Sequence, residues 1–287
     1  MNTIVFVCCT SLCGFAEFEP SDPFYGAVSV DGGAFSFEST QDRDFDNIPD
    51  DWVRRKGEGF PAYVYAQIDR QRGYDGRQSL RFDVNGGKAV MYSNVIDIDP
   101  GFSYVFHGVI RTQRLKNSAA AYTVSFLNHK RQRVQRYVSP VVSGTHQGWV
   151  NVRIDTMLPK ADVRFAVIGC HLLQGEKLDI QGSVWFDDIW LGRLPQLKLE
   201  SNFSTRFRER DADVNITSIV SGLDTERQYE LQLKMFNNAD VLLKEERQRL
   251  EMDEPEPAVL DDGSTQAIKK IASEKTNHWK LAPQDYG

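Results

Sequence analysis

Few residues of this chain have the types and spacing that catalysis requires. Its five histidines are scattered and form no His-x-x-x-His pair, and no glycine-rich phosphate loop follows an expected strand. A glycosidase needs two carboxylates across a cleft, and the sequence fixes no such pair. Cys170 and His171 are adjacent, but neighbouring residues of a strand point to opposite faces, so they cannot act together as nucleophile and base. We therefore expect Cys170 to be structural and this chain not to be an enzyme.

The overall charge argues against nucleic acid as a partner. The 287 residues carry a formal net charge of −6, and no basic stripe exists that could neutralise a phosphate backbone. With 41% hydrophobic and 26% charged residues, the chain can bury a core and fold as a globular protein. Its length suggests about two domains.

The N-terminus has the features of an export signal. Residues 4–16 form a short apolar run that ends in a small-x-small pattern before Glu17, and the run is too short to span a bilayer as a helix. We predict a signal peptide over 1–16 and a linker over 17–34. The alternatives are a mis-assigned start and a buried apolar strand. Export would place the protein outside the cell, in the periplasm or at the cell surface.

Residues 35–195 predict an antiparallel β-sandwich. Many short runs of β-branched and aromatic residues alternate there with turn signals, and the long helices of parallel α/β folds are missing. Val150, Val152 and Ile154 alternate with polar residues, the pattern of a sheet with one face on a core.

A second, smaller β domain is expected over 196–287, and we interpret it as immunoglobulin-like. A turn at 237–240 joins two strand-like runs into a hairpin, which needs further strands to stay folded. The charged stretch 245–256 either extends the second hairpin strand or begins a linker, and 266–275 has an amphipathic helical pattern. The aromatic and turn residues at the C-terminus suggest a fragment of a longer polypeptide, the alternative being an ordinary frayed end.

Several pieces in a fixed order give the larger region a family resemblance. They are Phe37-Glu38, Ile-Pro-Asp-Asp-Trp at 48–52, Tyr-Asp-Gly-Arg-Gln-Ser-Leu-Arg-Phe at 74–82, Ile-Asp-Pro-Gly-Phe-Ser-Tyr at 98–104 with Arg111-Thr112 after it, Ser-Gly-Thr-His-Gln-Gly-Trp at 143–149, and Ser-Val-Trp-Phe-Asp-Asp-Ile-Trp-Leu at 183–191. Together they resemble the galactose-binding-like jelly rolls, especially carbohydrate-binding modules of the cellulose- and xylan-binding type. The region after 191 resembles the front part of large exported bacterial proteins that carry such modules.

The resemblance implies a polysaccharide or glycan as partner, bound by aromatic faces with polar groups beside them. Aromatic candidates on the family's binding side are Trp52, Tyr63, Tyr65, Tyr74 and Tyr92. Polar candidates are His107 and Arg111, which share one face of the expected strand 104–112. For each of these aromatic residues, the alternative to a binding role is a position in the hydrophobic core. Three other aromatic residues are expected in the core because their family counterparts pack there: Trp149, Trp185 and Phe186.

The resemblance also implies a structural calcium ion held by Glu38 and Asp187, where the first strand of such modules meets the last. Two carboxylates make an incomplete shell for Ca²⁺, so backbone carbonyls would have to complete it. The alternative is that Asp187 caps a turn or accepts hydrogen bonds from neighbouring amides. No catalytic cofactor is expected.

The sequence therefore predicts an all-β protein whose jelly-roll sandwich binds carbohydrate without catalysis, as part of a larger exported protein. One alternative is a structural or protein-binding module of a cell-surface assembly. Another is the accessory N-terminal region of a glycoside hydrolase whose catalytic domain lies downstream. Fold does not fix function, so the site has to decide between them.

Overall fold

The computed structural model describes residues 4–11, 27–38, 42–43, 45–61, 63–175, 177, 179–201, 213–222, 229–236, 242–250, 257–259, 265–267 and 272–280. Within these ranges every regular element is a strand, which confirms the all-β prediction. The chain divides into two compact units, Pro23–Leu194 and a second one made of Met1–Asp22 and Pro195–Gly287. Each unit is described by itself.

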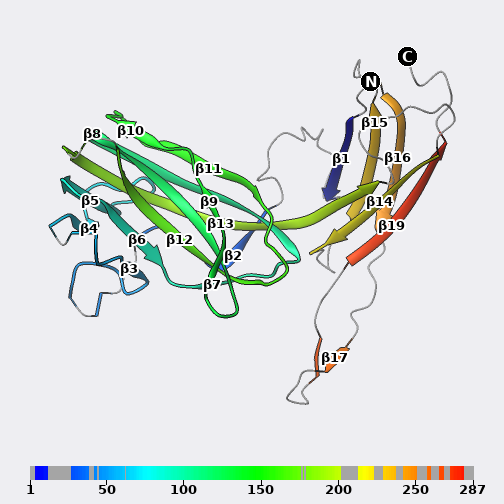
Figure 1. Ribbon diagram of the computed structural model, residues 1–287, viewed down its shortest axis with the longest axis horizontal. Helices are drawn as coiled ribbons and strands as arrows, with labels where there is room; N and C mark the ends of the chain where they lie inside the picture. Colours follow the sequence, from blue (N-terminus) through cyan, green and yellow to red (C-terminus); the bar gives the residue numbers. More distant parts are fainter. Residues whose placement is uncertain are drawn as a thin grey trace. The chain divides into compact units, whose positions relative to one another are not determined.

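The larger unit is a sandwich of two antiparallel sheets (Figure 1). The first sheet contains β4 (Tyr65–Asp69), β5 (Ser79–Asn85), β13 (Gln181–Ser201), the first part of β8 (Phe102–Asn128) and β11 (Val150–Met157), with β2 (Val28–Phe35) beside β13. The second sheet contains β3 (Trp52–Arg54), β6 (Ala89–Ser93), β12 (Val163–Gln174), the second part of β8 and β9 (Arg133–Val138), with β7 (Ile96–Asp97) and β10 (Val142–Gly144) at its ends.

Strand β8 belongs to both sheets. Its first part pairs with β11, where Ile110 lies opposite Val150, and its second part pairs with β12, where Tyr122 lies opposite Cys170. Arg114 and Asn117, between the two parts, both have φ of 53°, in the left-handed region that side chains rarely adopt. These two residues redirect the strand, so that one continuous segment serves both layers.

Aromatic side chains fill the core between the sheets. Tyr122 from the second sheet contacts Phe106 and Phe186 of the first, with ring centroids 5.1 Å and 5.2 Å away. The Tyr122 hydroxyl donates to the Val109 carbonyl at 2.9 Å, so this buried polar group is satisfied. At Gly108 a Cβ would lie 2.7 Å from the Tyr122 ring, which explains why a glycine stands in this buried strand. The core position predicted for Phe186 is confirmed.

Part of the expected linker 17–34 is a strand. β2 begins at Val28 and pairs with β13, where Ala34 lies opposite Trp190. Gly32 has a positive φ of 70°, and a Cβ on Gly33 would lie 3.1 Å from Leu191 Cβ. Gly32 and Gly33 have the composition of a loop, but here they are needed for a bulged, closely packed strand. Residues 17–26 lie outside the described residues.

The smaller unit contains two groups of strands and a short hairpin. β15 (Tyr229–Phe236) pairs with β1 (Ile4–Ser11) and with β16 (Leu242–Leu250), and β14 (Asp213–Ser221) pairs with residues 196–201 of β13 and with β19 (Ala272–Lys280). β17 (Pro257–Val259) pairs with β18 (Thr265–Ala267). The predicted hairpin is confirmed, and the charged stretch extends β16 as far as Leu250.

One expectation for this unit differs from the structure. The helical pattern over 266–275 is wrong, because β18 ends at Ala267 and β19 begins at Ala272; strand pairing overrides local propensity there. Residues 4–11 form β1, while 1–3 and 12–16 lie outside the described residues, and the signal peptide stays a prediction. The immunoglobulin-like assignment stays a prediction. In the described part of the chain, no helix is long and apolar enough to cross a membrane.

Candidate functional site

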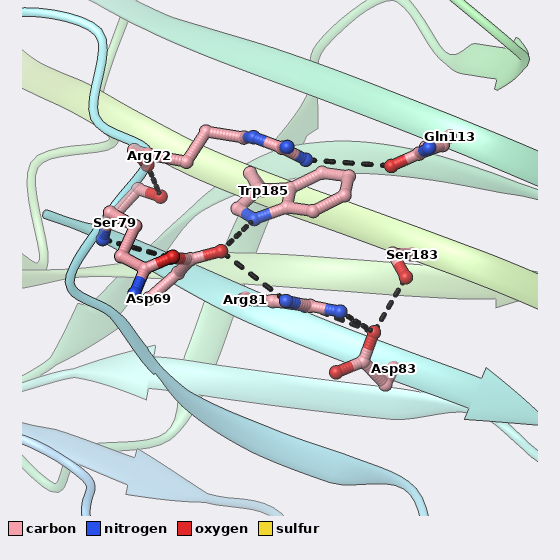
Figure 2. A network of polar contacts seen from close by, with 9 residues as sticks. Asp69, Arg72, Ser79, Arg81, Asp83, Gln113, Ser183 and Trp185 are labelled. Carbon is pink, nitrogen blue, oxygen red and sulfur yellow. Dashed lines mark hydrogen bonds and ion pairs between the residues drawn. The ribbon is translucent and has the colours of Figure 1, made fainter.

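The outward face of the first sheet is closed by its own side chains (Figure 2). Trp185 is only 1% exposed, yet it alternates with the core residues Val184 and Phe186 and therefore points away from the core. Arg72 and Arg81 lie over its ring, at 4.7 Å and 5.1 Å from the centroid. Trp185 is therefore buried as expected, although arginines cover its ring and it lies outside the cluster between the two sheets.

Carboxylates neutralise the cations of this network. Asp69 Oδ2 accepts a hydrogen bond from Trp185 Nε1 at 2.8 Å and lies 3.4 Å from Arg81, whose other terminal nitrogen is 2.8 Å from Asp83. Burial raises the pKa of Asp69, but the bonds from Trp185 and the Gln71 amide and the arginine charges outweigh it and lower the pKa. Arg81 is thus paired with two carboxylates, while Arg72 donates to the Gln113 amide oxygen at 3.4 Å.

The loop after β4 covers the same face. The Tyr74 amide donates to Asp187 Oδ2 at 2.7 Å, and the ring of Tyr74 lies 6.0 Å from the Trp149 ring. Trp149 is partly buried against this loop and outside the core cluster, so its expected core position is also wrong. The binding role predicted for Tyr74 gains no support, because its ring packs on the chain itself.

The two predicted calcium ligands hold this loop by hydrogen bonds. Glu38 Oε1 accepts from the amides of Arg77 and Gln78, at 2.8 Å and 2.6 Å, and Asp187 accepts from Tyr74 and from Asp188. This is the amide-accepting alternative considered for Asp187. Among the described residues no group of three or more His, Cys, Asp or Glu is placed to hold a metal.

Asp187 is an unusual carboxyl group. It is 2% exposed, and this burial raises its pKa to about 6, with the Glu38 and Asp188 charges adding to the rise and the two amide bonds opposing it. The negative charges of Glu38 and Asp187 thus lie near each other. Their two carboxylates could provide part of the oxygen shell that Ca²⁺ requires. Calcium stays a prediction on this geometry.

The aromatic residues predicted to bind sugar do not form one platform. Trp52 is 4% exposed and packs on Phe35 and Phe37, with centroids 5.1 Å and 5.5 Å away, so the prediction for Trp52 is wrong. Its side chain takes the inward position of β3. Tyr65 is 69% exposed at the edge of the first sheet, and Tyr63 borders an open cleft beside glycine-rich loops.

The two polar candidates lie far from Tyr92 in the topology, because they belong to the first sheet. His107 Nδ1 is 3.6 Å from Asp188 Oδ2. Arg111 is half-buried, and its Nε finds no acceptor in the described part of the chain. Of the predicted sugar-binding residues, only Tyr92 lies on the second sheet's outward face.

The second sheet presents a continuous row on its outward face. Directly paired residues across five strands are Val53, Tyr92, Gly169, Thr123 and Val138. Val53 and Val138 are exposed at the two ends, Tyr92 is half-buried, and Thr123 is only 1% exposed at the centre. The row therefore has a polar, recessed middle between apolar flanks.

His171 fixes the centre of this row. Its Nε2 lies 2.9 Å from Thr123 Oγ1 and 3.3 Å from the Arg136 guanidinium, and the Tyr92 ring stands edge-on at 5.7 Å. A Cβ on Gly169 would lie 2.6 Å from His171 Nε2, so the glycine lets the imidazole lie across the sheet.

The imidazole of His171 is neutral at physiological pH. Burial lowers its pKa to about 3, and the charges of Arg136, Arg55 and Arg133 lower it further. Because a guanidinium can only donate, Nε2 is the acceptor in the Arg136 contact and the proton is on Nδ1. The Nε2 lone pair is thus engaged by Thr123 and Arg136, and this buried contact fixes a cationic donor beside an aromatic ring.

Sequence reasoning did not select Thr123, Arg136 or His171 for binding. A signal was present in the run 163–172, where His171 alternates out of phase with the core residues Ile168, Cys170 and Leu172. The structural role expected for Cys170 agrees with its complete burial, which raises the pKa of its thiol.

Comparison with known proteins finds solved structures that match part of this chain. No protein-family model and no curated protein matches the chain. Among solved structures, the chain is similar to the C-terminal family 22 carbohydrate-binding module of Clostridium thermocellum Xyn10B, with a TM-score of 0.38, 11% identity, and coverage of 55% of this chain and 90% of that one. The CBM22-1 xylan-binding domain of Paenibacillus barcinonensis Xyn10C gives a TM-score of 0.37, 14% identity, and coverage of 56% and 92%.

A two-module Clostridium thermocellum structure is also similar, the N-terminal CBM22-1 and GH10 modules of endo-1,4-beta-D-xylanase 10B, complexed with xylohexaose. Its TM-score is 0.39 at 14% identity, and the match covers 56% of this chain but only 28% of that one.

Proposed function

We propose that the larger unit is a non-catalytic carbohydrate-binding module, and that the outward face of its second sheet binds the glycan. The carrying observation is the row from Val53 to Val138, in which apolar flanks and a tyrosine enclose a recessed polar centre at Thr123 and His171. A sugar ring has the complementary chemistry, since its CH groups contact apolar side chains and its hydroxyls exchange hydrogen bonds with polar ones.

The first sheet supports this choice by contrast. Its outward face is occupied by the Trp185 network and by the loop that Asp187 and Glu38 hold, so the Trp185 indole and the two carboxylates there already have partners within the chain. A module of this kind would hold a larger exported protein on its polysaccharide. Export and the attachment to further domains are parts of the proposal.

Retention on glycans in affinity electrophoresis tests the proposal. Tyr92→Ala should weaken retention about tenfold, the effect of losing about 1.4 kcal/mol of contact. Tyr65→Ala is the matched control, because Tyr65 is a more exposed tyrosine on the other sheet. Melting curves should show both variants folded.

The opposite pattern would contradict the assignment. If Tyr65→Ala abolishes retention and Tyr92→Ala does not, the binding face lies on the first sheet. If the folded wild-type protein is retained by no member of a broad panel of neutral and acidic glycans, the module binds something other than carbohydrate.

A further inference from the structure

Three arginines surround the centre of the second sheet's outward face. The Arg136 guanidinium lies 3.3 Å from His171 Nε2, and Arg133 stands at the start of the same edge strand, β9. On the other side, the Arg55 amide donates to the Val90 carbonyl at 3.0 Å, and Val90 lies directly opposite His171. The arginines thus approach the recessed centre from both edges of the sheet.

These cations lack the carboxylate partners that the first sheet provides. Arg81 forms ion pairs with Asp69 and Asp83 there, at 3.4 Å and 2.8 Å. Within the described residues, by contrast, no carboxylate lies within ion-pair distance of Arg55, Arg133 or Arg136. The whole chain has a formal charge of −6, so this positive face is a local arrangement and not a consequence of overall composition.

Two of these arginines, Arg55 and Arg136, are held in place by contacts within the chain. The Arg55 guanidinium lies 4.5 Å from the centroid of the Phe60 ring, a cation–π contact that restricts its motion. His171 restrains Arg136 in the same way by accepting its hydrogen bond. Ordering these side chains beforehand lowers the entropic cost of binding.

We propose that the glycan bound by this face is anionic, a saccharide that bears carboxylate or sulfate groups along its chain. The inference rests on the proposed function and specifies its ligand class. A guanidinium presents a planar fork of donors that matches a carboxylate or sulfate in two parallel hydrogen bonds. The neutral imidazole and the Thr123 hydroxyl are bonded to each other beneath the face, and the imidazole positions the Arg136 guanidinium for the anionic group.

The test compares two pectic polymers that share one backbone and differ only in whether their carboxyl groups are free and charged or esterified and neutral. We expect binding to de-esterified polygalacturonate and at least tenfold weaker binding to its fully methyl-esterified form, measured by isothermal titration at low salt. Dextran sulfate against dextran is the second arm and separates sulfate from carboxylate as the source of the charge. Binding should weaken with increasing salt.

Charge-neutralising variants assign the effect to this face. Arg136→Gln, Arg133→Gln and Arg55→Gln should each weaken binding of the anionic polymer about tenfold, equivalent to about 1.4 kcal/mol. Arg70→Gln is the control: it removes the same charge from an exposed residue just after β4, on the first sheet.

Each outcome decides the inference. Equal binding of esterified and de-esterified polymers, or unchanged binding by all three variants, would overturn it and leave the proposed function standing. Equal binding of polyglutamate would show that the face recognises anions without a sugar, and would overturn both. A preference for one anionic saccharide that the three variants abolish supports the inference.

Discussion

Lowering the pH from 7 to 5 in the presence of a calcium chelator should contribute stability to the sandwich through Asp187. Burial raises the pKa of this carboxyl from 3.8 to about 6 in the folded protein. Between these two values the native state binds more protons than the unfolded state, so the free energy of unfolding rises as the pH falls. At high pH the ionised Asp187 carboxylate lowers the free energy of unfolding by about 3 kcal/mol. About 1.3 kcal/mol of this stability is regained when the pH falls from 7 to 5.

Urea unfolding of the wild-type protein and of Asp187→Asn measures this contribution. Other carboxyls titrate in the same range, and Asp69, with its lowered pKa, changes stability in the opposite direction. The difference between the two proteins isolates Asp187, and it should shift by about 1.3 kcal/mol in favour of the wild type at pH 5. Asp155→Asn, at an exposed position of β11, is the control and should follow the wild-type profile. Parallel profiles for all three proteins would refute the reasoning.

Calcium should reverse this pH dependence if Glu38 and Asp187 hold the ion. A bound cation favours the ionised carboxylate, so stability at pH 7 should rise by about 2.7 kcal/mol at a hundredfold excess of calcium over its dissociation constant. Glu38→Gln should remove this response to calcium. In the presence of chelator, the variant and the wild-type protein should have similar stability. Identical melting curves with calcium and with chelator would exclude the ion.

Three further predictions concern other parts of the sandwich. Gly169→Ala should cost about 1–3 kcal/mol and weaken glycan binding, because its Cβ would lie within 2.7 Å of Thr123 Oγ1 and displace His171; unchanged affinity in titration calorimetry would argue against this face. Trp185→Phe should cost about 1.5–3 kcal/mol in urea unfolding through the lost bond to the Asp69 carboxylate, and a neutral result would mean that the network adds no stability. The chain should release no reducing sugar from common polysaccharides, and release that a single carboxylate substitution abolishes would show it to be an enzyme.

The sequence predicts the sandwich well because period-2 alternation is a local signal. Val152 and Ile154 face the core as their spacing indicates. β2 was missed because Gly32 and Gly33 have the composition of a loop, and only the close approach of Leu191, more than 150 residues later, shows why glycines are required in a strand.

The site was harder to predict because exposure is a tertiary property. Trp52 stands among charged residues yet takes the inward position of its strand, whereas Tyr92 follows an apolar run yet takes the outward position. Trp185 points outward and is nevertheless buried, since Arg72 and Arg81, from a segment about 100 residues earlier in the chain, cover its ring. The contact between His171 and Arg136 joins residues 35 apart and depends on strand register.

The pairing of β2 with β13 has a consequence for how the sandwich folds. The first strand of the unit finds its partner only when residues 189–193 are available, so closure joins the two ends of a segment of about 160 residues. Such high contact order predicts slow folding, on the millisecond-to-second scale or longer. During synthesis, β2 must remain unpaired with β13 until nearly the whole unit has emerged, so the first sheet cannot be completed before the last strand of the unit is available.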